Sequence, residues 1–73
     1  MSHPPAPDPP FEYVVIRVDE EYPKTWFAGY DEHYRARVTR NQNDAVRMKL
    51  DEARLAAYST RLDRGGVWGI RRI

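Results

Sequence analysis

The sequence predicts an α+β domain in which one helix covers one face of a four-stranded, mainly antiparallel sheet, in the order β-β-β-α-β. Two features of the chain indicate this. β-branched and aromatic runs alternate with polar turns over residues 11–39 and return at residues 67–73. Between them, over residues 44–64, the apolar period changes to about 3.6. Because 41% of the 73 residues are hydrophobic, the chain can form one small core.

The N-terminal segment has a different composition. Residues 1–10 contain five of the six prolines, which lack amide donors and fix φ, so we expect a disordered arm before a single domain at residues 11–73. The chain has no cysteine, which excludes disulfides and thiolate metal sites. No apolar run approaches the roughly twenty residues of a membrane span, so we expect no membrane partner.

The first strand is predicted at residues 11–18 (FEYVVIRV). Successive side chains of a strand point to opposite faces, so its residues form two sets. The set that we assign to the helix side is Val14, Ile16 and Val18. The set that we assign to the opposite, outward side is Tyr13, Val15 and Arg17.

Two further strands follow. After an acidic turn containing Pro23, residues 25–30 predict a second strand, in which Gly29 indicates a bulge or a crowded backbone. The buried face of this strand and the order of the strands stay open. Residues 34–39 predict a third strand. Its inward set is Tyr34, Ala36 and Val38, and its outward set is Arg35 and Arg37.

The helix is predicted after the capping residues 41–44, with an inward stripe and larger residues beside it. The stripe is Val46, Leu50, Ala53 and Ala57, flanked by Leu55, Tyr58 and Leu62. An interruption near Met48 would leave a single turn before a helix starting at Asp51. The helix ends before Gly65 and Gly66, and residues 67–73 form the last strand, with Trp68 and Ile70 in the core.

Catalytic and metal-binding motifs are weak in this chain. The run Asp31-Glu32-His33 combines carboxylates with an imidazole, but consecutive side chains in a hairpin turn diverge, and no nucleophile lies nearby. We therefore predict a solvated turn and no enzyme activity. His3 and His33 lack paired ligand spacing, so we expect neither a metal nor another cofactor.

Charge is distributed unevenly. Residues 1–33 carry two basic and seven acidic side chains, a net charge of −5, and residues 34–73 carry ten basic and four acidic, a net charge of +6. Ten of the twelve basic residues are arginines, which suit carboxylate or phosphate partners. A basic and aromatic nucleic-acid-binding module is therefore the alternative function, although the acidic first half weakens long-range attraction to phosphates.

The runs at residues 13–17 (YVVIR), 26–30 (WFAGY) and 43–48 (NDAVRM) resemble small RNA-polymerase-binding transcription regulators of lytic Xanthomonas phages. The resemblance covers most of residues 11–73. It implies a protein that binds the N-terminal region of the polymerase β′ subunit. It also implies inhibition of initiation by disturbed σ engagement, and antitermination. We expect a monomer in the host bacterial cytoplasm, because a chain without cysteine suits a reducing compartment.

The contact surface is predicted from strand alternation. If the helix covers one face of the sheet, the outward residues of neighbouring strands share the other face, and a mixture of aromatic residues and arginines suits an interface centre. The predicted partner-binding residues are Tyr13, Val15, Arg17, Arg35, Arg37 and Arg71. An ordinary solvated sheet face remains the alternative.

Overall fold

The computed structural model of the chain describes residues 12–73, so the arm predicted at residues 1–10 lies outside the described part. The elements in chain order are β1 (Tyr13–Arg17), β2 (Trp26–Tyr30), β3 (Ala36–Thr39), the short 3-10 helix η1 (Gln42–Asp44), α1 (Leu50–Arg64) and β4 (Trp68–Arg72). The strands form one antiparallel sheet in the order β3-β2-β1-β4. This confirms the predicted α+β fold. Within residues 12–73, no helix is long and apolar enough to span a bilayer.

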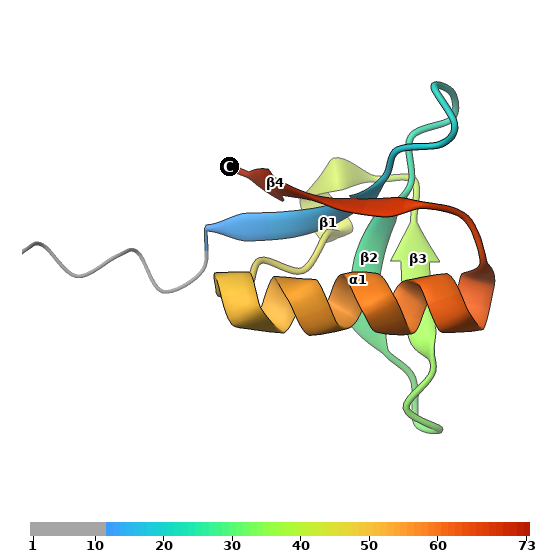
Figure 1. Cartoon of the computed structure of the whole chain (residues 1–73), viewed down its shortest axis with the longest axis vertical. Coiled ribbons are helices and arrows are strands. Elements are labelled where there is room, and N and C mark those ends of the chain that lie inside the picture. Colours follow the sequence, from blue (N-terminus) through green and yellow to red (C-terminus); the bar gives the residue numbers. More distant parts are fainter. Residues whose placement is uncertain (1–11) are drawn as a thin grey trace, which may run out of the picture.

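The sheet consists of two strand pairs that run in different directions (Figure 1). β1 and β4 extend along α1, whereas β2 and β3 cross behind it. β1 pairs with β4 over its whole length but meets β2 at a single register position, Ile16 opposite Trp26. The strand pairs therefore diverge, and another segment must satisfy the backbone groups between them.

The segment before α1 fills this gap. Met48 and Tyr13 exchange two backbone hydrogen bonds of 2.9 and 3.0 Å, and the amide of Val46 donates to the carbonyl of Phe27 at 3.1 Å. Because this segment pairs as a strand, the helix cannot begin before Leu50. The sequence left open whether the helix is interrupted near Met48, and the structure shows that it is.

The main core lies between α1 and the sheet. Its buried residues are Val15, Phe27, Ala36, Met48, Ala53 and Ala56. The assignment of β1 faces was therefore wrong, because Val15 rather than Val14 and Ile16 faces the helix. Three consecutive buried residues, Val14 to Ile16, make both faces of this strand apolar, so alternation alone cannot orient it.

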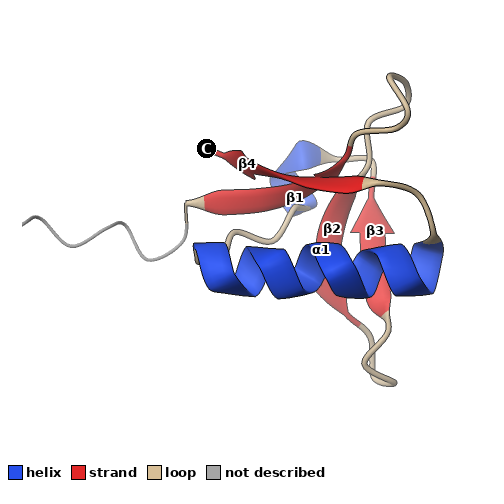
Figure 2. Cartoon of the chain, in the orientation of Figure 1, coloured by secondary structure: helices blue, strands red, loops and turns tan. Residues whose placement is uncertain are grey.

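A second, smaller core covers the other face of the sheet. Val14, Ile16 and Trp26 are buried there, with Ala45 packed against them. Figure 2 shows η1 behind the sheet, on the side opposite α1. The expectation that this face is simply exposed was wrong, because the β3–α1 connection crosses it.

The inward face of α1 carries small residues. Ala53, Ala56 and Thr60 are buried, and the Thr60 hydroxyl donates to the carbonyl of Ala56 at 2.6 Å. The predicted stripe is correct at Ala53 and Ala57 but wrong at Leu50, which is exposed, and at Val46, which precedes the helix.

The β2–β3 hairpin differs from the prediction at one end. The register shift between Phe27 and Tyr30, with Gly29 at φ 101°, confirms the predicted bulge. Tyr34, expected inward, is 86% exposed and adopts φ 60° in the turn. Arg35 also belongs to this turn, because β3 begins only at Ala36.

The outer edge of β3 is held by the end of the helix. The Ala36 amide donates to Asp63 Oδ2 at 2.8 Å, and Arg64 Nε donates to the Ala36 carbonyl at 2.9 Å. The two side chains thus complete the hydrogen bonding of Ala36, a fully buried residue. This contact fixes the C-terminal end of α1 against β3.

Candidate functional site

The structure separates the six predicted contact residues. Tyr13, Val15 and Arg17 alternate on the helix side of β1, where Val15 is 0% exposed and Tyr13 packs against the main core. Arg35 lies in the hairpin turn. Only two of the six occupy the face away from the helix: Arg37, next to inward Ala36, and Arg71, directly opposite Val14. The predicted common face was wrong, and Val15 is too deeply buried to contact a partner in this fold.

Arg17 takes part in an intramolecular ion pair. Its Nε donates to Asp19 Oδ1 at 2.7 Å, and its Nη2 lies 3.3 Å from Glu20 Oε1. The hydrogen bond from Arg17 lowers the pKa of the Asp19 carboxyl to about 2, and the same bond raises the pKa of the guanidinium. Two carboxylates already neutralise Arg17, so it is poorly placed to attract a charged partner.

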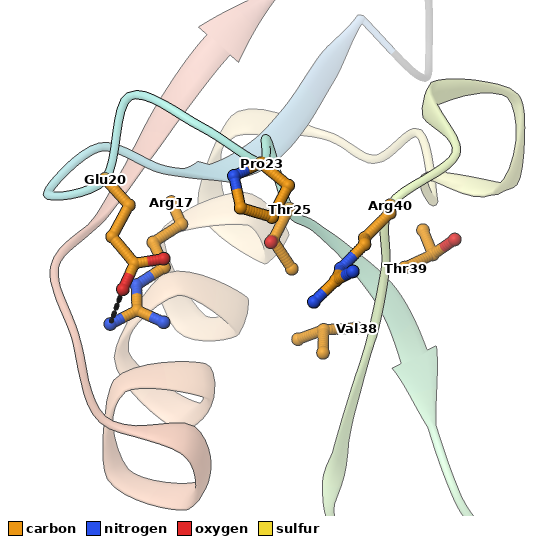
Figure 3. A pocket seen from close by; sticks show the side chains of 7 residues that line it. All are labelled: Arg17, Glu20, Pro23, Thr25, Val38, Thr39 and Arg40. Carbon is orange, nitrogen blue, oxygen red and sulfur yellow. Dashed lines mark ion pairs between the residues drawn. The ribbon is translucent and has the colours of Figure 1, made fainter.

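A surface pocket of about 330 Å³ lies beside this ion pair. Figure 3 shows the Arg17–Glu20 pair on one side, Arg40 on the other, and Thr25 between them. The lining is divided between charged and small side chains. Because Arg17 is already paired, Arg40 is the one cation of this lining that could bind an anion, and Glu20 would repel the anion. The pocket is therefore a weak candidate for a ligand site.

The run Asp31-Glu32-His33 forms a hairpin turn, as predicted. Asp31 Oδ1 accepts hydrogen bonds from the amides of Arg35 and His33, at 3.0 and 2.8 Å, and these bonds lower the pKa of its carboxyl. His33 Nε2 lies 3.6 Å from Glu32, and both side chains are largely exposed. The arrangement stabilises a turn.

Metal ligands do not gather elsewhere in the described part of the chain. Within residues 12–73, no group of three or more His, Asp or Glu side chains is placed to hold a metal ion.

The outward face of α1 is the feature that the sequence analysis missed. Leu55, Tyr58 and Leu62 are spaced i, i+3 and i+7, so they lie on one side of the helix, and they are 68%, 62% and 67% exposed. We call these three residues the helix patch. Large apolar side chains aligned at this spacing are typical of helices that dock into a groove of another protein.

A groove with a mixed polar and apolar lining adjoins the helix patch. It has a volume of about 560 Å³ and lies between the C-terminal half of α1 and the start of β4. Its lining residues are Ala57, Tyr58, Arg61, Gly66, Val67 and Trp68. Tyr58 belongs to both features, so the patch and the groove form one continuous surface.

Trp68 and Ile70 connect the groove to β4. Trp68 is half-buried against the main core, as predicted, and its indole Nε1 donates to the carbonyl of Gly65 at 2.7 Å. Ile70, predicted in the core, is 36% exposed. Because β4 is an edge strand, nothing in residues 12–73 covers Ile70 from the side.

A signal for the helix patch was present in the sequence. Leu55, Tyr58 and Leu62 repeat with the same helical spacing as the inward residues, so the helix has two apolar stripes. The prediction placed these larger residues as flanks of the inward stripe. In this fold the opposing sheet supplies the bulk of the core, and the three residues stay exposed.

Comparisons of the chain with protein-family models, with curated proteins and with solved structures find no significant match.

Proposed function

We propose that this protein is a phage-encoded regulator that binds host bacterial RNA polymerase, inhibits initiation by disturbing σ engagement and promotes antitermination. The β′ subunit is the partner that the resemblance of residues 13–17, 26–30 and 43–48 implies. The observation that carries a binding function is the helix patch with its adjoining groove. Leaving Leu55, Tyr58 and Leu62 in water forgoes about 1.5–3 kcal/mol for each side chain that a partner could bury.

The placement of the arginines supports a protein partner over nucleic acid. Arg17 pairs with Asp19, Arg64 donates to a backbone carbonyl, and Arg72 pairs with Glu12 at 3.0 Å. Arg37 and Arg71 lie on the face opposite the helix. A nucleic-acid-binding domain is expected to gather its basic residues on one face.

The test is binding to purified bacterial RNA polymerase together with promoter-dependent transcription. We expect the wild-type chain to bind polymerase and suppress transcription, and we expect no binding to free promoter DNA at near-physiological salt. The variant Leu55→Ser/Tyr58→Ser/Leu62→Ser should keep the fold but bind at least tenfold more weakly.

The matched control removes exposed apolar surface elsewhere. Tyr22 and Tyr34 are 87% and 86% exposed and lie outside α1 and β4. Their replacement by serine should leave polymerase binding unchanged. Tight binding to DNA with none to polymerase would overturn the proposal in favour of the nucleic-acid-binding alternative.

A further inference from the structure

We infer that β4 and the groove beside it bind an extended segment of the partner, which adds as a fifth strand to the sheet. Strand addition combines backbone hydrogen bonds along an open edge with pockets for alternate side chains. The inference rests on the proposed function, because the partner that supplies the segment is taken to be RNA polymerase.

The backbone groups of β4 point alternately toward β1 and away from it. The amide of Val18 donates to the carbonyl of Val67, and the amide of Ile73 donates to the carbonyl of Glu12. In an antiparallel pair such residues alternate, so Gly69 and Arg71 also point toward β1. The backbone groups of Trp68 and Ile70 therefore point away from β1, toward the open side of the last strand in the order β3-β2-β1-β4.

The two edges of the sheet differ in how well they are protected. On β3, Asp63 and Arg64 bind the amide and the carbonyl of Ala36, so an added strand would have to displace both side chains. At Trp68 and Ile70, by contrast, β4 has neither a proline nor a register shift, two features that commonly protect an edge. The β4 edge is therefore the better template for pairing.

A strand added to β4 would meet different side chains on the two faces of the sheet. Trp68 and Ile70 lie opposite Arg17 and Val15, on the helix side, where the groove contains Tyr58 and Arg61. On the other side of β4 an added strand would meet Gly69 and exposed Arg71.

The chemistry of the occupant follows from this alternation. Residues facing the helix side should be apolar, to pack against Ile70 and against Trp68 at the groove. Those between them should include Asp or Glu, to face Arg71, and another carboxylate near the groove would pair with Arg61. The occupant is thus an extended segment with alternating apolar and acidic side chains.

The decisive variant is Ile70→Pro. Proline removes the outward amide of residue 70 but leaves the β1–β4 bonds, which Gly69 and Arg71 make, and edge strands tolerate proline when its nitrogen faces outward. Ile70→Ala is the matched control, since it removes the same side chain and keeps the amide. We expect Ile70→Pro to bind purified bacterial RNA polymerase at least tenfold more weakly than Ile70→Ala. Equal affinities of two folded variants would overturn strand addition.

Hydrogen exchange of the wild-type protein gives a second readout that does not depend on a variant folding. In the free chain the amides of Trp68 and Ile70 should exchange quickly, and in the polymerase complex they should be protected. Binding without this protection would overturn the inference and leave the proposed function standing, whereas no binding would overturn both. Protection in the free chain that increases with its own concentration would identify a second copy as the occupant and would also overturn the inference.

Discussion

The inward face of α1 carries Ala53, Ala56 and Thr60, and the outward face carries Leu55, Tyr58 and Leu62. The side chains on the two faces differ more in size than in apolar character. Small residues let the helix approach the sheet closely, where Val15, Phe27 and Met48 provide the volume of the core. Burial on this helix is thus decided by fit to the opposing surface, and the larger apolar residues remain exposed.

Truncating a side chain on each side of α1 to alanine should give the largest difference in the free energy of unfolding. Phe27→Ala removes the largest side chain of the main core and should lower the free energy of unfolding by about 3–5 kcal/mol. Leu55→Ala on the outward face should change it by about 0.5 kcal/mol or less. Chemical denaturation of both variants checks this, and equal losses would show that Leu55 is covered in solution.

Enlarging an inward residue of α1 should lower the stability of the fold less than truncating Phe27 does. Ala56 is 2% exposed and faces the sheet, so Ala56→Leu should overpack the interface and destabilise the fold by about 1–3 kcal/mol. Arg54→Leu adds a comparable side chain at an exposed position of the same helix and should be nearly neutral. Thermal melting compares the two, and an unchanged midpoint for Ala56→Leu would reveal unfilled space beneath α1.

The order of elements could be predicted from the sequence because local signals specify it. Alternation and turn residues located the strands, Gly29 marked the bulge, and the change of period located the helix. A break near Met48 was a possibility that the sequence left open, and the structure shows both the break and its cause, the pairing of Met48 with Tyr13.

Orientation could not be predicted in the same way. Val14, Val15 and Ile16 are all apolar, so the period of two gives two sets without saying which set faces α1. On the helix, either of two apolar stripes could pack against the sheet. Which one is buried depends on the shape of the sheet surface, which the sequence pattern does not reveal. The candidate site was missed because periodicity alone does not say which of two apolar faces is buried.

The contact between the end of α1 and β3 should have an intermediate effect. Asp63→Ala leaves the amide of buried Ala36 without its acceptor, which should cost about 1–3 kcal/mol. Asp51→Ala, at the exposed first turn of the same helix, is the control and should cost less. Denaturant unfolding gives the energies, and faster exchange of the Ala36 amide in Asp63→Ala would assign the loss to this bond.

Replacing Arg17 should have the smallest effect on stability. This residue lies on the helix side of β1, but its guanidinium forms an exposed ion pair with Asp19. The Asp19 carboxyl has a pKa of about 2 against an ordinary value of 3.8, because Arg17 donates a hydrogen bond to it. A carboxyl whose pKa is lower in the folded state stabilises the fold above pH 3.8, and that contribution is lost as the pH falls toward 2. Arg17→Gln should therefore move the Asp19 titration, followed by NMR, back toward 3.8, while Arg71→Gln should leave it at about 2. An Asp19 titration near 3.8 in the wild-type chain would mean that Arg17 is free in solution, and it would restore Arg17 as a candidate for contact with an acidic partner.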